Sequence, residues 1–274
     1  MAANNKVVGL IAGQGDLPRQ IIQQCQRQEI PIVAAAFENQ TPSDTVQSVP
    51  HTWLKLGTVA ALLNYFRSQS VTHVVMAGSI RRPSLAELSL DWTGTKLLAK
   101  LGFSSVGDDG LLSAIVKYLE EQGFTVLGAT ELLDDLIMPS ACLTLTQPTA
   151  EEIRDIRMAQ QILLKLGEAD VGQALIIQQG LILGVEAIEG TEKLISRTQE
   201  YKRSGRSPIL VKMAKPQQDL KVDLPTIGLE TVSQCVKASF AGIAVQAGKT
   251  QFLHRDKSIQ LANQNNIFII GFEE

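Results

Sequence analysis

The stretch "VVGLIAGQGDLP", residues 7–18, decides the fold class of this chain. Its apolar run is short enough for a buried strand of a parallel sheet, and it stops at Gly13, with Gly15 two positions later. The apolar residues that follow recur every four positions, the spacing of one helix face: Leu17, Ile21 and Cys25. A strand that enters a glycine turn and then a helix predicts the first unit of a parallel α/β sheet.

The rest of the first half alternates in the same way. Apolar runs at residues 31–37, 72–78 and 124–129, with a further one around 51–56, predict strands. Helical spacing of apolar residues predicts helices over 59–66 and 111–119. We therefore expect an α/β protein whose N-terminal domain is a Rossmann-like, doubly wound parallel sheet.

The pattern changes at residues 138–148, where Pro139 and Pro148 bracket a segment without helical spacing. We expect a domain boundary there, between a Rossmann-like domain of residues 1–138 and a C-terminal domain of residues 139–274.

The second half predicts a mixed α/β domain. Thr149 with Glu152 forms a capping-box pattern ahead of a helix, and Gln179-Gly180 between two apolar runs predicts a hairpin turn. Further strand-like runs lie at residues 207–214, 241–247 and 266–272.

Composition limits the function classes. With 45% hydrophobic and 19% charged residues the chain is an ordinary globular one, and a net charge of −3 argues against nucleic acid as the main partner. No apolar run approaches the roughly 18 residues that span a bilayer, and we expect no signal peptide. The three cysteines lack metal-binding spacing, which favours buried free thiols and a cytoplasmic protein.

The first glycine loop is an incomplete dinucleotide motif. G-x-G-x-x-G requires a third glycine, but Pro18 occupies that position, although Glu38 lies where a ribose-binding acid is expected. Asp16 would repel an anion, or it could cap the helix. A redox cofactor, another nucleotide or phosphate ligand, and a plain tight turn all stay open for this loop.

Two more stretches of the first half have polar residues at element ends. "AGSIRRPS", residues 77–84, places Gly78, Ser79 and two arginines after a strand, which suits either a phosphate or a solvated basic turn. "GDDGLL", residues 107–112, predicts a helix start capped by Asp108 or Asp109.

Charged residues are densest in the second half. "VEAIEGTE", residues 185–192, ends a strand in Glu186, Glu189 and Thr191. Residues 211–228 add lysines and aspartates around a proline turn. Carboxylates that hold Mg²⁺ beside lysines are what a metal-assisted phosphoryl site needs, although solvated surface charges would give the same pattern.

At these motifs the sequence resembles the LpxI-type UDP-2,3-diacylglucosamine pyrophosphatases of lipid A biosynthesis. The motifs follow the family order nearly end to end: "GLIAGQGDLP", "AGSIRRPS", "GDDGLL", "DVGQALII", "VEAIEGTE" and "VDLPTIG". The resemblance implies a Rossmann-like domain, a C-terminal α/β domain and a lipid substrate held between them. It also implies Mg²⁺-dependent hydrolysis of UDP-2,3-diacylglucosamine to 2,3-diacylglucosamine 1-phosphate and UMP, with water attacking phosphorus on the sugar side.

The resemblance also assigns roles to residues. It makes Asp223 the catalytic residue, and from the acidic cluster we expect Asp223, Glu186 and Glu189 to be metal ligands. The substrate contacts that it implies are Gly13, Gly78, Ser79, Gln173, Thr191, Lys212 and Thr226. The enzyme would work at the inner face of the cytoplasmic membrane, because its substrate carries two acyl chains, and a homodimer is left open.

Two other classes of function remain as alternatives. A nicotinamide-dependent oxidoreductase would need the missing third glycine. A sugar-nucleotide sensor without catalysis would bind the substrate without turnover.

Overall fold

The computed structural model describes residues 6–81, 89, 91–101, 108–133, 136–218 and 223–273, without the side chains of 97–101 and 108–111. The chain divides into two compact units. The first comprises Met1–Asp134 with Asp219–Asp223, and the second comprises Asp135–Gln218 with Leu224–Glu274. Whether residues 1–138 and 139–274 fold as separate domains stays a prediction.

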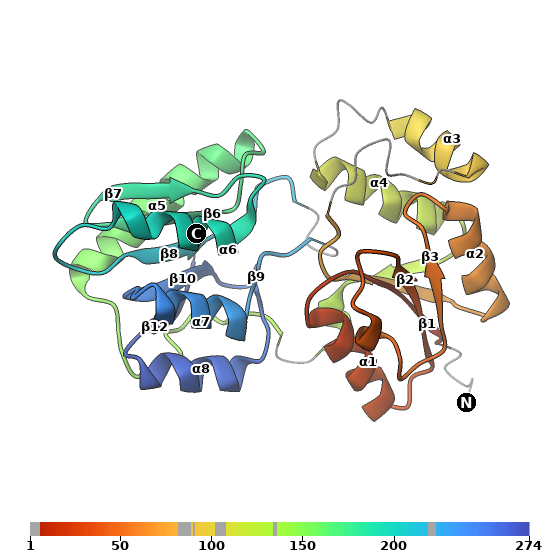
Figure 1. Ribbon diagram of the computed structural model, residues 1–274, viewed down its shortest axis with the longest axis horizontal. Helices are drawn as coiled ribbons and strands as arrows, with labels where there is room; N and C mark the ends of the chain where they lie inside the picture. Colours follow the sequence, from red (N-terminus) through yellow and green to blue (C-terminus); the bar gives the residue numbers. More distant parts are fainter. Residues whose placement is uncertain are drawn as a thin grey trace. The chain divides into compact units, whose positions relative to one another are not determined.

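The first unit holds a five-stranded sheet in the order β3-β2-β1-β4-β5, with every pair parallel (Figure 1). This strand order confirms the predicted Rossmann-like sheet. Its strands are β1 (Val8–Ala12), β2 (Ile32–Phe37), β3 (His51–Leu54), β4 (His73–Ala77) and β5 (Thr125–Leu127). The predicted strand 124–129 ends early at Leu127, because the chain turns into a short 3-10 helix at Ala129.

Helices cover both faces of this sheet. The crossover β1-α1-β2 runs along the sheet in the opposite direction from β3-α2-β4, so right-handed connections place α1 and α2 on opposite faces. Phe66 of α2 and Leu119 of α4 share one buried cluster with Ile11 and Val74 of the sheet. The helices are α1 (Leu17–Arg27), α2 (Val59–Ser68), α3 (Trp92–Leu101) and α4 (Asp108–Glu121), with 3-10 turns η1 (Ser43–Thr45) and η3 (Ala129–Glu131).

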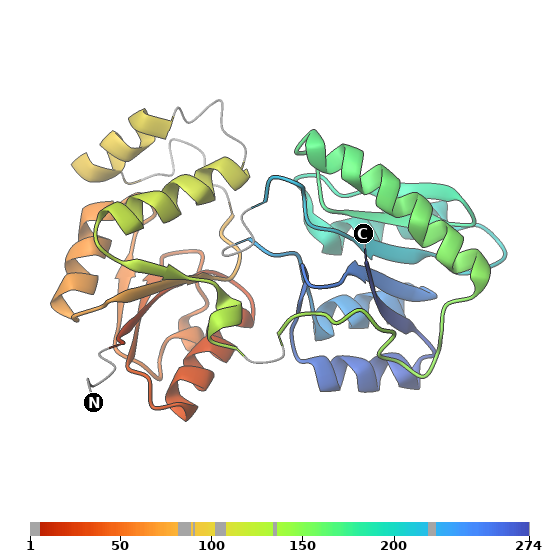
Figure 2. The same ribbon diagram turned by 180° about the vertical axis from the view of Figure 1, so that it is seen from behind.

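The second unit is built on a mixed five-stranded sheet in the order β12-β10-β8-β6-β7 (Figure 1). In the rear view of Figure 2, the long helix over Ala150–Glu168 lies in front of this sheet. Strands β8, β10 and β12 are parallel, whereas β6 is antiparallel to both β8 and β7. The strands are β6 (Ala174–Gln178), β7 (Leu181–Val185), β8 (Ile209–Lys212), β10 (Gly242–Gln246) and β12 (Phe268–Phe272). A separate parallel pair joins β9 (Thr226–Ile227) to β11 (Gln251–Phe252).

The central strands of this sheet are buried on both faces, which explains their continuous apolar runs. Alternate residues of β6 pack on different helices: Leu175 lies in a cluster with α5, and Ile176 lies in a cluster with α6, α7 and α8. The helices are α5 (Ala150–Glu168), α6 (Gly190–Thr198), α7 (Leu229–Lys237) and α8 (Arg255–Gln264), with the 3-10 turn η4 (Gln199–Tyr201).

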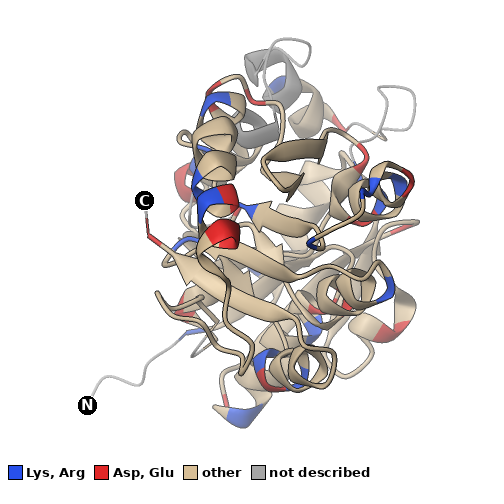
Figure 3. Cartoon of the chain, turned by 90° about the vertical axis from the view of Figure 1, so that its left-hand side faces the viewer, with Lys and Arg blue, Asp and Glu red and all other residues tan. Residues whose placement is uncertain are grey.

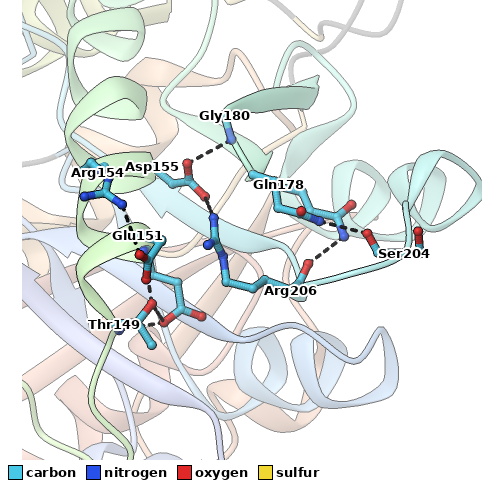
Figure 4. Close-up of polar contacts among 10 residues, drawn as sticks. Thr149, Glu151, Arg154, Asp155, Gln178, Gly180, Ser204 and Arg206 are labelled. Atoms are coloured by element: carbon cyan, nitrogen blue, oxygen red, sulfur yellow. Dashed lines mark hydrogen bonds and ion pairs between the residues drawn. The ribbon is translucent and has the colours of Figure 1, made fainter.

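Two local predictions for this unit are confirmed. The Thr149 hydroxyl accepts a hydrogen bond from the backbone N–H of Glu152, whose carboxylate accepts one from the backbone N–H of Thr149, so the capping box starts α5. Gln179 and Gly180 form the β6–β7 turn, with φ of 50° and 76°. Figure 4 shows how side chains fix this turn: Asp155 accepts a hydrogen bond from the Gly180 N–H, and Gln178 donates one to the Arg206 carbonyl.

Basic and acidic residues are mixed on one face of the second unit (Figure 3). Among the described residues, no helix has the length and apolar character that a membrane span requires. The three cysteines are free; Cys25 and Cys235 are buried, and Cys142 is half-buried.

Candidate active site

Polar side chains gather at one edge of the second sheet. Lys212 ends β8, and it pairs with Ala174 at the start of the antiparallel strand β6. The neighbouring strand β7 ends just before Glu186, and β10 ends at Gln246. We call this edge the carboxyl edge. Because open α/β sheets bind ligands beyond the carboxyl ends of their parallel strands, this is where a site is expected.

Lys212 is the buried cation of this edge. The residue is only 4% exposed, and its Nζ donates hydrogen bonds to the Thr191 hydroxyl (2.9 Å) and to the Thr226 carbonyl (3.2 Å). Burial lowers the pKa of Lys212 below its ordinary value, while the negative charge of Glu186 acts in the opposite direction. In its protonated form Lys212 would place a positive charge in a nearly dry position, where it would attract an anion strongly.

Glu186 is the buried anion beside it. Its Oε1 accepts a hydrogen bond from the Thr191 hydroxyl at 2.6 Å, and the residue is 6% exposed. The second oxygen, Oε2, is buried and accepts no hydrogen bond from the described residues. The backbone is also fixed, because the Glu186 N–H donates to the Ala174 carbonyl and Gly172 packs directly against the Glu186 carbonyl.

Three glutamines frame the loop that follows β8. The carbonyl of Gln173 accepts a hydrogen bond from the Met213 N–H at 2.9 Å, and its side-chain oxygen accepts one from Gln218. Gln246, which is 2% exposed, accepts a hydrogen bond from the Ala214 N–H at 3.0 Å. Gln246 did not figure in the sequence prediction, although a polar residue that ends the apolar run of β10 is a signal that could have found it.

Glu189 is paired with Arg197 of α6. Its carboxylate accepts two hydrogen bonds from Arg197, whose guanidinium also donates to the Val185 carbonyl. A hydrogen bond from its own backbone N–H, together with Arg197, lowers the pKa of Glu189. Both side chains line an open groove on α6, with Lys193, Ser196 and Glu200 among its other residues.

Asp223 lies three residues before β9 and is half-buried. The division between the two units falls directly after it. Nearby, the Thr226 hydroxyl lies within hydrogen-bond distance of two acceptors for its single proton, the Leu224 carbonyl (3.1 Å) and the Gln251 side-chain oxygen (3.2 Å). The described residues contain no group of three or more His, Cys, Asp or Glu side chains that could hold a metal. Asp223, Glu186 and Glu189 are therefore not gathered as such a group.

The predicted residues of the first unit lie at the carboxyl ends of β1 and β4. Gly13 donates its N–H to the Ala77 carbonyl, while Gln14 and Ser79 exchange backbone hydrogen bonds of 2.8 and 3.1 Å. These three N–H groups are therefore used within the protein. The Ser79 side chain is exposed, whereas Gly13 is buried.

The two glycines let these loops approach each other. A Cβ on Gly13 would lie 2.6 Å from the Ser79 carbonyl oxygen, and one on Gly78 would lie 2.4 Å from the Gln14 carbonyl oxygen. Both glycines therefore allow this close backbone packing, and their contact with substrate stays a prediction. Asp16 occupies the N-cap position of α1 without a side-chain capping hydrogen bond, and Pro18 falls in the first turn.

Replacing Gly78 with alanine is expected to destabilise the protein more than replacing Gly15. Both glycines have positive φ, 86° and 89°, so each alanine costs about 1–2 kcal/mol in backbone conformation. Only at Gly78 does the new methyl group also meet backbone, since no described atom lies within 4 Å of that position at Gly15. Thermal unfolding followed by circular dichroism should show Gly78→Ala melting several degrees below Gly15→Ala. Equal melting temperatures would argue against the close approach.

Several predicted features lie outside the described residues. These are the arginine at position 82, the side chains of Asp108 and Asp109, and residues 219–222 of the proline-turn segment.

Comparison with known proteins agrees with this two-unit layout. The LpxI N-terminal domain matches residues 7–136, and the LpxI C-terminal domain matches residues 139–270. A curated relative, "UDP-2,3-diacylglucosamine pyrophosphatase LpxI" of Caulobacter vibrioides, is 30% identical over 273 residues, which cover 97% of each chain.

Solved structures give weaker likenesses. CobK precorrin-6A reductase is 11% identical, with 98% of this chain and 88% of that chain covered, at a TM-score of 0.32. The biotin carboxylase subunit of pyruvate carboxylase is 16% identical, with 70% of this chain and 40% of that chain covered, at a TM-score of 0.26. Similarities this low carry no argument about function. The matches to both domains and to the Caulobacter relative span nearly the whole sequence, and the chain therefore belongs to the LpxI family.

Proposed function

We propose that this protein hydrolyses the pyrophosphate bond of UDP-2,3-diacylglucosamine and so acts in lipid A biosynthesis. The products are 2,3-diacylglucosamine 1-phosphate and UMP. The observation that carries the proposal is the end-to-end match to a pyrophosphatase with this substrate in its name. A nicotinamide-dependent oxidoreductase is not favoured, because Pro18 replaces the third glycine of the dinucleotide motif.

The carboxyl edge of the second sheet has the chemistry that this reaction needs. A pyrophosphate is an anion, and Lys212 offers it a buried ammonium group. Two N–H groups of that ammonium donate to Thr191 and Thr226, and the third has no acceptor among the described residues. We assign this third N–H to a phosphate oxygen of the substrate.

The reaction transfers a phosphoryl group to water. The water oxygen forms a bond to the phosphorus on the sugar side, and the bond from that phosphorus to the bridging oxygen breaks. UMP leaves with the bridging oxygen, and a proton of the water is lost. In this proposal the Asp223 carboxylate orients the water and accepts its proton, while Lys212 offsets the negative charge of the phosphate groups.

Mg²⁺ is the proposed cofactor. Mg²⁺ in phosphoryl-transfer sites is held by one or two carboxylates together with substrate phosphates and water, so a group of three protein ligands is not required. The half-buried Asp223 fits such a role as the single protein carboxylate. Glu189 is held by Arg197 and Glu186 by Thr191, and neither is assigned to the metal here. Bound Mg²⁺ would neutralise charge on the pyrophosphate.

The acyl chains of the substrate place the reaction at a membrane surface in this proposal. Ile188 is fully exposed and Val171 is 45% exposed. Both are close in sequence to the carboxyl edge, since Ile188 follows Glu186 and Val171 precedes Gly172, which packs on Glu186. These apolar side chains suit contact with lipid. We propose peripheral binding at the inner face of the cytoplasmic membrane.

The test is direct. The purified protein should release UMP from UDP-2,3-diacylglucosamine in detergent micelles with Mg²⁺, as detected by chromatography with mass spectrometry. UDP-N-acetylglucosamine, which lacks the acyl chains, is the matched control and should be a much poorer substrate. A protein that binds the lipid but releases no UMP with any divalent metal would instead be a sugar-nucleotide sensor.

A further inference from the structure

We infer that Glu186 and Thr191 are positioning residues, which hold the Lys212 ammonium in place through a chain of hydrogen bonds from Lys212 to Thr191 to Glu186. Neither residue then contacts the substrate or a metal. The inference deepens the proposed function, because it rests on Lys212 as the group that meets the phosphate. It changes the role of Thr191, which the family resemblance assigned to substrate contact.

The geometry fixes the direction of this chain. An ammonium group can only donate hydrogen bonds, and an ionised carboxylate can only accept them. The Thr191 hydroxyl therefore accepts from Lys212 at 2.9 Å and donates its single proton to Glu186 at 2.6 Å. Because that proton is already used, the hydroxyl has no proton left for a substrate oxygen.

Burial strengthens the two hydrogen bonds that connect Lys212, Thr191 and Glu186. Lys212 and Glu186 are 4% and 6% exposed, so water does not compete for their hydrogen bonds. Hydrogen bonds with an ionised partner are stronger than neutral ones, and this chain has an ionised group at both ends. Thr191 is the second residue of α6, so the start of the helix fixes where the ammonium group lies.

The anchor at the Glu186 end is the backbone. Its N–H donates to the Ala174 carbonyl at 2.8 Å, and a Cβ on Gly172 would lie 2.0 Å from the Glu186 carbonyl oxygen. The Glu186 backbone, just after β7, is thus held against the start of β6, and its carboxylate extends from a fixed position. The other carboxylate oxygen of Glu186, Oε2, accepts no hydrogen bond from the described residues. No second donor among them therefore draws the carboxylate away from Thr191 and Lys212.

The experiment is a double-mutant cycle with Lys212. Thr191→Val removes the hydroxyl at nearly constant shape, Thr191→Ser retains it, and Glu186→Gln removes the charge. Breaking either of these hydrogen bonds displaces the Lys212 ammonium group from its position at the phosphate. A displacement of that kind costs about 10- to 100-fold in turnover. We expect this fall in kcat for Thr191→Val and Glu186→Gln, with activity close to the unmodified protein for Thr191→Ser.

The cycle itself is measured on the affinity for UDP, by calorimetry, because Lys212→Met leaves little turnover to compare. Thr191→Val and Glu186→Gln should weaken UDP binding when Lys212 is present and change it little in the Lys212→Met background. UDP binding also separates this inference from the proposed function, since it does not depend on release of UMP from the lipid.

A second threonine–glutamate pair in the same unit of the protein serves as a matched control. Thr149 donates its hydroxyl to the carboxylate of Glu152 at 2.9 Å, and Glu152 is 8% exposed, but this pair caps α5 and holds no lysine. Thr149→Val and Glu152→Gln should lower the melting temperature and leave kcat and UDP affinity per folded molecule unchanged. The inference is overturned if the Thr191 and Glu186 variants behave like these controls, or if they weaken UDP binding equally with and without Lys212.

Discussion

Replacing Asp223 with alanine is expected to lower turnover by about a hundredfold or more, because loss of a positioned acid–base group costs about 10²–10⁴ in rate. Asp223 lies between β8 and β9, two residues ahead of Pro225, outside any helix or strand, and it is half-buried, so little packing is lost with its carboxylate. The variant should stay folded and still bind the UDP-lipid. Initial rates of UMP release and a melting curve measure the two effects on one preparation.

The two roles open to Asp223 separate in this experiment. As a turn residue that bonds its own backbone, its loss would cost about 0.5–2 kcal/mol of stability and little activity per folded molecule. Asp223→Asn keeps the shape without the charge and should be as inactive as Asp223→Ala. Asp44→Ala, which removes an exposed aspartate paired with Arg19, is the control and should retain full turnover. An early-melting but active Asp223 variant would make the residue structural.

The first half of the fold follows closely from the sequence, because local signals and tertiary packing agree there. Buried parallel strands have continuous apolar runs, and β1 and β2 have them. The possible strand orders can also be narrowed from the sequence, because strand–helix alternation and right-handed crossovers leave few topologies. The mixed topology of the second sheet could not be predicted in this way, because periodicity does not tell which neighbour a strand such as β6 pairs with.

The glycine loop shows what a motif alone does not determine. The motifs predict that Gly13 and Gly78 contact the substrate, and the structure adds that a Cβ at either position would collide with backbone. The motif does not say what comes close to them. In the structure it is the other loop's backbone, because β1 and β4 are neighbours in the sheet although they lie far apart in the chain.

The charged residues show the same limit. Glu186, Thr191 and Lys212 were each identified from the sequence, but not their connection by hydrogen bonds, which depends on the pairing of β6 with β7 and β8. Glu186 and Glu189 were given the same role because they share one motif. They differ in the structure, where one is buried beside Lys212 and the other pairs with Arg197 on α6.

Chelation of divalent metal is expected to abolish turnover, and added Mg²⁺ should restore it. The pyrophosphate carries more negative charge than Lys212 alone offsets, and a metal supplies several kcal/mol of stabilisation to the transition state, about 10³-fold or more in rate. UMP release in excess EDTA, followed by a Mg²⁺ titration, measures the effect. Full activity in the chelator would show that the protein's own cations suffice.

The same titration tests where the metal lies. The described residues include no group of three or more His, Cys, Asp or Glu side chains that could hold a metal, and in this proposal EDTA should leave the melting temperature of the free protein unchanged. The metal should bind with the substrate instead, and Asp223 should be its protein ligand. In that case the residual activity of Asp223→Asn needs a higher Mg²⁺ concentration to saturate than the unmodified protein does. If Asp223 only orients the water, the variant is slower at every Mg²⁺ concentration but has the same half-saturation point.

Glu186→Gln should leave the Mg²⁺ half-saturation point unchanged under either outcome, because the Glu186 carboxylate is used to hold Lys212 through Thr191. A shift in the half-saturation point for Glu186→Gln would return Glu186 to the metal and remove it from the positioning role.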